Sequence, residues 1–436
     1  MQLYSTNKIS VNVGFEEAIF RGLPPDNGLY MPLSIPKLPQ LFWDNVENLS
    51  LQEIAFEICN VLIGDDIPTE DLKSLVDQAI NFEAPPVVQI KENIYCLELF
   101  HGSSMAFKDF GARFMAAVMS YFLKKSQKSI NILVATSGDT GGAVAQGFFE
   151  KDNISVTILY PEGKVSNIQE KQLTTLGKNI KALEIDGTFD DCQALVKKAF
   201  LDENLRDRFN LASANSINIA RLIPQSFYYV AAYAALKKLG KKYVFSVPSG
   251  NFGNLTAGIL AIKMGMPATT FIAATNINNV VPEYLESGIY SPISPSKSTI
   301  SNAMDVGNPS NFPRLKALFG GNLSEMKKQL IGCFFDDDQT REGIKELYES
   351  YSYLTCPHSA IAYLGLKEYL NENQDTVGVF LSTAHYAKFL PEMESTLGFS
   401  PDIPDRLASL LNKTKVAVSM ANDFEDFKSY LNQNLI

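Results

Sequence analysis

The sequence predicts an α/β protein with a parallel β-sheet that is covered by helices on both faces. Three observations support this. Short, almost continuously apolar segments alternate with helical ones after residue 90, and glycine-containing turns separate them. The chain has 436 residues, of which 46% are hydrophobic, so it can bury a large core in two or three domains.

The first ninety residues are predicted to be mainly helical. Residues 51–63 and 70–82 carry apolar side chains at positions i, i+3, i+4 and i+7, a spacing typical of amphipathic helices. Pro85 and Pro86 follow. Because the residue before a proline disfavours helix, this pair indicates a junction with the part of the chain that follows.

Strands and helices then alternate. Strands are predicted at residues 130–135, 154–160, 181–185, 243–247, 271–275 and 377–381. One helix is predicted to begin near Asp109, because Phe110, Phe114, Val118 and Phe122 recur every four residues. Two more are predicted, one from Ala143 and one over residues 255–264. Ligands of such sheets bind at the carboxyl ends of the strands, where the glycine turns fall.

The charge of the chain bears on its partners. Lys and Arg number 38 against 48 Asp and Glu, a formal net charge of −10. Such a chain repels the phosphates of nucleic acids and anionic lipid surfaces, so we expect neither as a partner. No apolar run approaches the roughly 18–20 residues that span a bilayer. The first six residues lack the basic region of a secretory signal, so we expect a cytoplasmic protein.

Cysteine and histidine usage excludes several kinds of site. The five cysteines are scattered and form no C-x-x-C pair, so neither a disulfide framework nor a zinc ribbon is expected. His101, His358 and His385 are the only histidines and form no H-E-x-x-H motif, so no metal is expected. Lysine, hydroxyl groups, backbone amides or a cofactor would have to carry any chemistry.

Two of the predicted turns could bind anions. Residues 136–142 follow the strand at 130–135, and residues 248–254 follow the strand at 243–247. Small residues let backbone N–H groups approach a ligand, and the helix that follows offers unpaired donors and the positive end of its dipole. Neither turn is a P-loop or a dinucleotide fingerprint. Glycines also serve simply as tight turns, so either loop alone leaves the question open.

Lys108 lies at the predicted start of a helix, among Met105, Ala106, Phe107 and Phe110. Apolar surroundings lower the pKa of an amine, and a neutral amine can form a Schiff base. A generic lysine would instead extend its ammonium group to water. The two anion-binding turns favour the first interpretation, because a Schiff-base lysine together with phosphate-binding loops is what pyridoxal phosphate requires.

These segments resemble the threonine synthases, pyridoxal-phosphate enzymes of the tryptophan-synthase-β-like fold. Residues 105–111 resemble the segment of the cofactor lysine, residues 136–141 the loop for the substrate carboxylate, and residues 249–254 the loop for the cofactor phosphate. Residues 4–6 and 21–30 resemble the opening of the longer, microbial and fungal branch. The similar segments occur in the expected order and extend to His385.

The resemblance implies a division of the chain. It implies two doubly wound α/β domains with an N-terminal, mainly helical extension. Residues 1–90 would form the N-terminal threonine-synthase region. Residues 91–210 would form the smaller α/β domain, with the lysine and the carboxylate loop. Residues 211–436 would form the larger α/β domain, with the cofactor-phosphate loop, and the chain would cross between the domains more than once.

The resemblance also implies roles for single residues. Lys108 would hold pyridoxal 5'-phosphate and act as the base at the α-carbon of the substrate, Asp139 would lie near the pyridine hydroxyl, and Thr383 would bind the pyridine nitrogen. The cofactor phosphate would be bound by Gly250, Asn251, Phe252, Gly253 and Asn254. The substrate would be bound by Ser137, Gly138 and Thr140 at its carboxylate, and by Asn215, Ser216, Arg221 and Lys388 at its phosphate.

The implied activity converts O-phospho-L-homoserine and water to L-threonine and phosphate, by γ-elimination and then β-addition of water, as the last step of threonine biosynthesis. An alternative keeps fold and cofactor but makes the protein a β-eliminating lyase or dehydratase on serine, threonine or a phosphorylated hydroxy-amino acid. A plain dehydratase has no substrate phosphate for Arg221 to bind. A non-catalytic cofactor-binding protein is a further alternative. We expect a monomer or a homodimer.

Three positions depart from the pattern of the family. Tyr386 stands where proline is usual, and Cys356 and Ser359 stand where Asp and Thr are usual. Pro357 and Ser359 still suit the start of a helix, so we expect the structure to tolerate the changes at residues 356 and 359, whereas the backbone geometry at Tyr386 is left open. His358 is expected to be a hydrogen-bonded structural group at least as readily as a catalyst.

Overall fold

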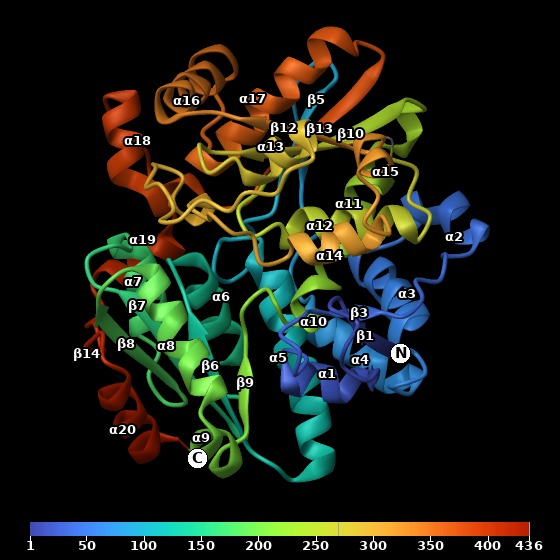
Figure 1. The fold of residues 1–436 in the computed structure, drawn as a ribbon. Helices are drawn as coiled ribbons and strands as arrows, with labels where there is room; N and C mark the ends of the chain where they lie inside the picture. The colour runs from blue at the N-terminus through green and yellow to red at the C-terminus, as the bar shows by residue number, and fades with distance from the viewer. Residues whose placement is uncertain (269, 436) are drawn as a thin grey trace.

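The computed structural model describes residues 1–268 and 270–435 and contains three sheets (Figure 1). Its strands are β1 (Gln2–Ser5), β2 (Val13–Gly14), β3 (Tyr30–Pro32), β4 (Val87–Lys91), β5 (Ile94–Glu98), β6 (Ile130–Ala135), β7 (Ile154–Pro161), β8 (Ile180–Asp186), β9 (Leu211–Ser213), β10 (Lys242–Pro248), β11 (Thr270–Thr275), β12 (Leu330–Phe334), β13 (Thr376–Ser382) and β14 (Val418–Ala421).

Helices connect and cover these strands. They are α1 (Phe15–Arg21), α2 (Gln40–Asn45), α3 (Leu51–Ile63), α4 (Thr69–Ala79), α5 (Lys108–Ser126), α6 (Asp139–Phe148), α7 (Asn167–Thr174), α8 (Phe189–Leu201), α9 (Glu203–Arg208), α10 (Ile219–Leu222), α11 (Gln225–Leu236), α12 (Gly253–Lys263), α13 (Val280–Ser287), α14 (Phe312–Leu318), α15 (Leu323–Lys327), α16 (Asp337–Tyr351), α17 (Pro357–Glu372), α18 (Leu390–Leu397), α19 (Asp405–Leu411) and α20 (Phe424–Asn434).

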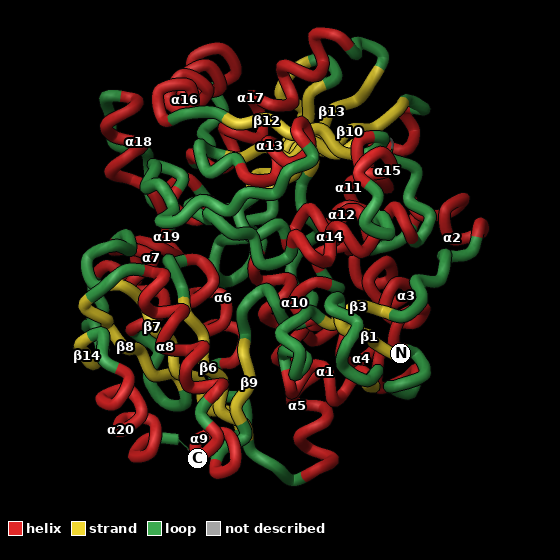
Figure 2. Tube along the Cα trace, in the orientation of Figure 1, coloured by secondary structure: helices red, strands yellow, loops and turns green. Residues whose placement is uncertain are grey.

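Two of the sheets are built mainly from parallel strands. The larger one has the strand order β12-β11-β10-β13-β5-β4, in which only β4 is antiparallel to its neighbour. The other has the order β14-β8-β7-β6-β9 and is parallel throughout. Figure 2 shows the two groups of strands in different halves of the molecule, each with helices around it. Strands β6 and β7 are buried at every residue, which explains why their sequences are continuously apolar. The predicted fold class is confirmed.

The chain passes between the two parallel sheets more than once. Strand β5 pairs with β13 in the larger sheet, but the next strand, β6, lies in the smaller one. Strand β14, near the end of the chain, returns to the smaller sheet and pairs with β8. Sheet membership therefore does not follow sequence order, and the boundaries at residues 90 and 210 stay a prediction.

The N-terminal region combines helices with a small antiparallel sheet of order β2-β1-β3. Helix α3 has the predicted bounds, and Ser50 and Glu53 form a capping box at its start. Helix α4 ends at Ala79, three residues before the predicted end, since the backbone of Ile80 leaves the helical region. Contacts of α3 with α11, and of α4 with α5, join this region to the rest.

The helix predicted from Ala143 begins earlier, at Asp139, so that prediction was wrong. The Thr136 hydroxyl accepts the backbone N–H groups of Gly138 and Gly141, which starts the helix at the turn itself. Gly141 lies inside this helix, and the position requires glycine because a Cβ there would be 2.6 Å from Cγ2 of Thr136. The glycines that suggested a loop are thus required by close packing.

Short and edge strands were not predicted. Strand β9 has only three residues, and β12 and β14 lie at sheet edges, where half of the backbone groups remain unpaired. No helix in residues 1–268 or 270–435 combines the length and the apolarity needed to cross a membrane.

Candidate functional site

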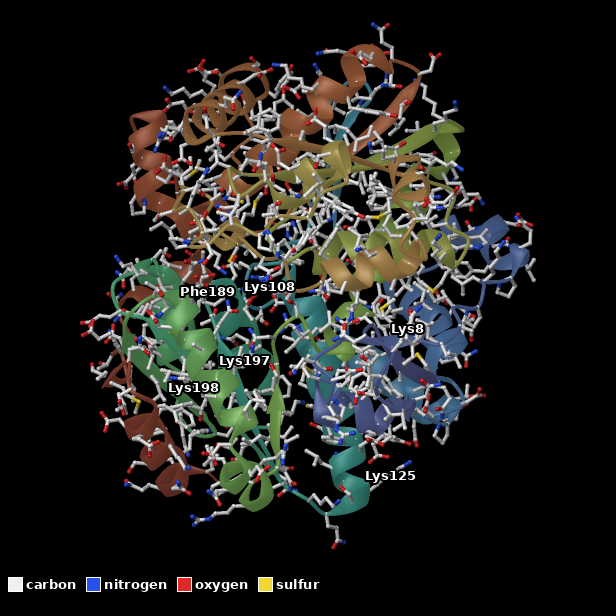
Figure 3. All side chains as sticks on the ribbon, viewed as in Figure 1. Lys8, Lys108, Lys125, Phe189, Lys197 and Lys198 are labelled. Atoms are coloured by element: carbon white, nitrogen blue, oxygen red, sulfur yellow. The ribbon has the colours of Figure 1, made fainter. Side chains whose placement is uncertain are left out.

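The candidate site lies where the ends of strands β6, β10 and β13 meet the start of α5. In Figure 3, Lys108 lies between the parts of the molecule that hold the two large sheets. Two adjoining cavities, which we call the site cavities, share Lys108, Thr140, Ser216 and Asn251 in their walls. Of the residues predicted for the site, those that line the cavities are Lys108, Ser137, Asp139, Thr140, Asn215, Ser216, Arg221, Gly250, Asn251, Phe252, Gly253, Asn254 and Thr383. Gly138 and Lys388 do not.

Lys108 is the first residue of α5 and is partly buried. Burial lowers the pKa of its amine to about 8, because a charged ammonium loses solvation there. The carboxylate of Asp139 acts in the opposite direction, while the positive charges of Arg221 and Lys388 reinforce the effect of burial. A substantial fraction of the amine is therefore neutral, and nucleophilic, near neutral pH.

The segment before Lys108 is tied to the segment that carries Thr383. The N–H of Phe107 donates to the carbonyl oxygen of Thr383 over 2.8 Å, and the N–H of His385 donates to the carbonyl oxygen of Met105 over 3.1 Å. Met105 has a φ of 56°, a conformation that non-glycine residues seldom adopt. These bonds hold the lysine and Thr383 on one wall of the cavity.

Asp139 begins α6 and is only 5% exposed. Its carboxylate lies 2.6 Å from the ammonium group of Lys388 and accepts a hydrogen bond of 2.9 Å from the side-chain amide of Gln169. Burial raises the pKa of this carboxyl group, but the charges of Lys388 and Lys108 outweigh burial and hold the pKa below its usual range. The carboxylate is therefore charged at neutral pH.

Lys388 and Gly138 differ from what the resemblance implied. Lys388 is fully buried behind Asp139 and donates a second hydrogen bond, of 2.9 Å, to the carbonyl oxygen of Ser104. The N–H of Gly138 donates to Thr136, so it is already committed within the turn. Gly138 has a φ of 133°, and a Cβ there would lie 2.6 Å from the side chain of Gln169. The carboxylate loop is shaped by close packing as well as by hydrogen bonds.

The turn at residues 249–254 forms a second anion-binding element. A Cβ on Gly250 would lie 2.8 Å from the carbonyl oxygen of Ala303, so only glycine fits there. Phe252 has a φ of 61°, and its side chain does not cap the helix α12 that follows. The first two residues of α12, Gly253 and Asn254, line the cavity, so the positive end of the helix dipole lies at its wall.

Arg221 reaches the cavity from α10 and is 3% exposed. One end of its guanidinium donates to the carbonyl oxygen of Ala214, but Nε has no hydrogen-bond partner among the residues that the structure describes. Gly111 of α5 lets Arg221 lie there, because a Cβ at Gly111 would be 2.7 Å from that Nε. An unpaired buried donor of a charged group indicates an anionic ligand.

Ser216 and Asn215 complete this wall. The side-chain amide of Asn215 donates to the carbonyl oxygen of Ala135 at the end of β6, over 2.9 Å. The hydroxyl of Ser216 accepts a hydrogen bond of 3.2 Å from the side-chain amide of Asn311. The backbone N–H of Asn311 in turn donates to the carbonyl oxygen of Asn251. Asn311 thus connects the Ser216 segment with the turn at residues 249–254.

Two residues of this region escaped prediction as site residues. Arg314 is fully buried and donates to the carbonyl oxygens of Ser216 and Ile217, and also to that of Tyr30 in β3. His358, for which both a structural and a catalytic part were left open, lines the cavity with a Nδ1 that has no partner in the described part of the chain. Its Nε2 accepts the N–H of Ala303, so Nδ1 carries the proton. No local motif marks either residue.

The departures at residues 356 and 359 are accommodated as expected, and the structure also accommodates Tyr386. Helix α17 begins at Pro357, and the sulfur of Cys356 lies 3.1 Å from the hydroxyl of Ser359. That hydroxyl also accepts the backbone N–H of Thr383. The ring of Tyr386 packs on His385 with 4.2 Å between centroids, and its hydroxyl donates to the carbonyl oxygen of Asp402.

The donors at this site fit pyridoxal phosphate. The amine of Lys108 lies near a turn whose amides suit a phosphate, and the guanidinium of Arg221 and the imidazole of His358, each with one unpaired nitrogen, line the same cavity. One phosphate would occupy the turn before α12. A second anion would meet the guanidinium of Arg221.

Comparisons with known proteins agree with this site. The chain matches family models described as pyridoxal-phosphate dependent enzyme over residues 82–383, threonine synthase N terminus over residues 2–80, and threonine synthase, C-terminal, over residues 359–431. A threonine synthase of Buchnera aphidicola is 43% identical and covers 99% of both chains.

Solved structures show the same similarity. The crystal structure of threonine synthase from Escherichia coli has a TM-score of 0.93 and is 43% identical, and the match covers 99% of this chain and 100% of that one. The crystal structure of PLP-bound threonine synthase from Brucella melitensis has a TM-score of 0.92 and is 34% identical, with 99% of each chain covered.

Proposed function

The chain belongs to the threonine synthase family of pyridoxal-phosphate enzymes, and we propose that its substrate is O-phospho-L-homoserine. The observation that carries this substrate is the unpaired Nε of Arg221. Arg221 is a buried cationic donor separate from the turn at residues 249–254, which suits the cofactor phosphate. An enzyme for serine or threonine would leave this donor without a partner, at the cost of its desolvation.

Each predicted residue except Gly138 has a part in this proposal. Lys108 holds the cofactor, and Gly250, Asn251, Phe252, Gly253 and Asn254 bind its phosphate, mainly through backbone N–H groups. Asp139 would lie near the pyridine hydroxyl of the cofactor, and Thr383 would bind its pyridine nitrogen. The hydroxyl groups of Ser137 and Thr140 bind the carboxylate of the substrate, while Asn215, Ser216 and Arg221 bind its phosphate. Lys388 acts through Asp139 as a positioning residue.

The reaction requires a bond to break at the γ-carbon and another to form at the β-carbon. Bound pyridoxal phosphate supplies an electron sink that makes protons on the substrate acidic. Lys108 removes the proton at the α-carbon and then one at the β-carbon. Arg221 and Ser216 bind the phosphate as it leaves with the electron pair of the C–O bond. Water supplies the hydroxyl at the β-carbon, and protons return to the α- and γ-carbons.

The carboxylate of Asp139 affects the proton transfers of Lys108 through its negative charge. It lies near Lys108 and raises the pKa of that amine relative to burial alone, so the amine can both accept and return a proton near neutral pH. Lys388 keeps Asp139 ionised. The Asp139–Lys388 pair therefore tunes the base without touching the substrate.

A product assay tests the proposal. Cofactor-loaded protein is supplied with O-phospho-L-homoserine, and the amino-acid product and free phosphate are measured. Threonine and phosphate in equal amounts are expected. Formation of 2-oxobutanoate without threonine would overturn the proposal. Turnover of serine, threonine or a β-phosphorylated amino acid, without turnover of O-phospho-L-homoserine, would support the β-eliminating alternative, and absence of turnover with bound cofactor would support a non-catalytic protein. A cytoplasmic location and a monomeric or homodimeric state complete the proposal.

A further inference from the structure

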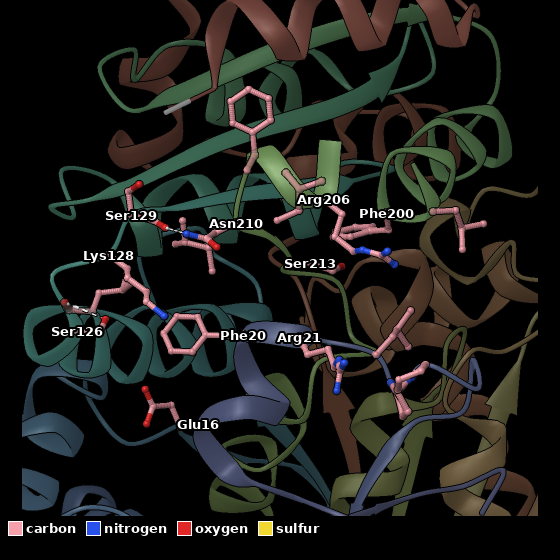
Figure 4. A pocket seen from close by; sticks show the side chains of 18 of the residues that line it. Glu16, Phe20, Arg21, Ser126, Lys128, Ser129, Phe200, Arg206, Asn210 and Ser213 are labelled. Carbon is pink, nitrogen blue, oxygen red and sulfur yellow. Dashed lines mark hydrogen bonds between the residues drawn. The ribbon is translucent and has the colours of Figure 1, made fainter. Parts of the chain in front are cut away.

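A large cavity lies away from the site cavities. It has a volume of about 770 Å³ and lies between α1, the end of α5, helices α8 and α9, and strand β9 (Figure 4). None of the described residues that line it lines either site cavity. Its volume falls within the range of roughly 300–1,000 Å³ that is usual for small-molecule sites.

Apolar side chains form much of its wall. Phe20 comes from α1 and Phe200 from α8, and Figure 4 shows the two aromatic rings on different sides of the cavity. Phe209 and Leu211 come from the segment that leads into β9. Leu201, at the end of α8, also lines the cavity and is 59% exposed. An occupant with an apolar body would cover this surface.

The charged side chains of the cavity are mostly positive. Arg21, Lys128 and Arg206 line it, and Glu16 is the one acidic residue among its described walls. This balance is the reverse of that of the whole chain, whose net charge is −10. Arg21 forms an exposed ion pair, whereas Lys128 forms none with any residue in the described ranges. The cavity therefore favours an anion.

We propose that this cavity binds a small organic anion with an apolar body, and that the bound anion acts on the substrate segment through β9. The anionic group would lie toward Lys128, and the apolar body would pack on Phe20 and Phe200. An inorganic anion would leave the apolar wall uncovered, and an uncharged apolar molecule would make no use of the positive charge of Lys128.

A short chain of contacts connects this cavity with the site cavities and supports the proposed effect of the anion on the substrate segment. This effect rests on the proposed function. Strand β9 is an edge strand of three residues, and both Leu211 and Ser213 line the cavity. The hydroxyl of Ser213 accepts the backbone N–H of Asn215, the next residue but one, which lines the site cavity. Asn218 also donates to the carbonyl oxygens of Ile19 in α1 and of Ser213. A ligand that shifts β9 or α1 thus shifts the segment that binds the substrate phosphate.

A fluorescence titration with anilinonaphthalene sulfonate tests the binding site, because this probe joins an anionic group to fused aromatic rings. The titration uses the folded, cofactor-loaded protein without substrate. We expect saturable binding of one probe per chain, weakened about tenfold by Lys128→Glu. Lys164→Glu makes the same change of charge at an exposed lysine outside the cavity walls and should leave affinity unchanged. Equal loss in both variants, or no saturation, would overturn the proposal.

The same probe tests the connection to the site. Titrations at increasing concentrations of O-phospho-L-homoserine should change the Kd of the probe about fivefold and then reach a plateau, and the probe should change the Kd of the substrate by the same factor. A Kd that rises in proportion to substrate, without a plateau, would show direct competition and overturn the separate site. No change at all would overturn the connection. The substrate-free titration stands independently of the proposed function.

Discussion

Arg314 offers a test of how the N-terminal region and the substrate segment are held together. We predict that Arg314→Met destabilises the protein and weakens its affinity for the phosphorylated substrate. The guanidinium is fully buried and donates four hydrogen bonds, three of them to the carbonyl oxygens of Tyr30, Ser216 and Ile217. The fourth, of 2.9 Å, goes to the side chain of Asn311. Burial lowers the pKa of Arg314 to about 9.

The expected magnitude follows from these contacts. Hydrogen bonds from a charged donor contribute about 1.5–3 kcal/mol each, so four would amount to roughly 6–12 kcal/mol. Methionine removes the cost of burying a charge, which offsets several kcal/mol of that loss. Three carbonyl groups stay buried without their donor. We therefore expect a net loss of about 3–5 kcal/mol, a large part of the stability of a typical protein.

Two assays measure the effect of Arg314→Met. Urea unfolding can be followed by the fluorescence of Trp43, the only tryptophan, which is buried in α2 against Tyr233. The KM for O-phospho-L-homoserine should rise about tenfold while cofactor absorbance is retained, because Ser216 loses its anchor. Arg341→Met, at a partly exposed ion pair with Glu392, is the matched control. A loss below about 1 kcal/mol with unchanged KM would refute the reasoning.

Further predictions concern the site itself. Lys108→Ala should abolish turnover and borohydride-stable labelling by the cofactor, and retained labelling would show that another lysine holds it. The rate at which apoprotein takes up pyridoxal phosphate can be followed by absorbance, and it should rise about tenfold per pH unit below pH 8 and level off above pH 8. The reason is that burial lowers the pKa of Lys108 to about 8 and only the neutral amine reacts. A rate that still rises steeply above pH 9 would contradict this. Gly111→Ala should raise the KM for the phosphorylated substrate about 10- to 100-fold, because its Cβ would lie 2.7 Å from Nε of Arg221, and an unchanged KM would show that Arg221 does not bind the phosphate. Asp139→Asn should lower kcat about tenfold or more and shift its pH profile, because buried Lys388 loses its counter-ion; an unchanged profile would remove Asp139 from the tuning of the base.

Matched controls separate these effects from general damage. Gly14→Ala places a Cβ where no atom lies within 4 Å, so the same substitution should leave KM unchanged. Alanine also has a higher helix propensity than glycine, so Gly111→Ala should not weaken α5. Lys125→Ala, at an exposed position on the same helix as Lys108, should keep normal labelling.

The buried ion pair between Asp139 and Lys388 leads us to propose another role for Lys388 than the resemblance implied. The resemblance implied that Lys388 binds the substrate phosphate. In the structure its ammonium group is occupied by Asp139 and by the carbonyl oxygen of Ser104. A second cation beside the phosphate would also strengthen binding in the ground state, whereas a cation behind Asp139 affects the base. Replacement of Lys388 should therefore change kcat and its pH profile more than KM.

Local patterns in the sequence determined the parts of this protein that depend on near neighbours. Continuous apolar runs predicted the buried strands β6 and β7, because both faces of a central parallel strand lie in the core. The turns at residues 136–142 and 248–254 were recognisable because a strand, a glycine turn and a helix follow one another within a few residues. Lys108 was recognisable from its apolar neighbours. Sequence therefore predicted the walls of the site and the ligand type.

Tertiary structure decided which distant groups meet. Arg314 contacts Tyr30, and Lys388 contacts Ser104, each across 284 positions of the chain, so no local motif could reveal either pair. The place of His358 in the cavity depends on how α17 packs against the segment of Ala303. The large cavity beside β9 exists only because α1, α8 and the end of α5 meet there. Secondary structure follows from neighbours a few residues apart, but the charges, donors and cavities of a site follow from packing between segments that the sequence keeps far apart.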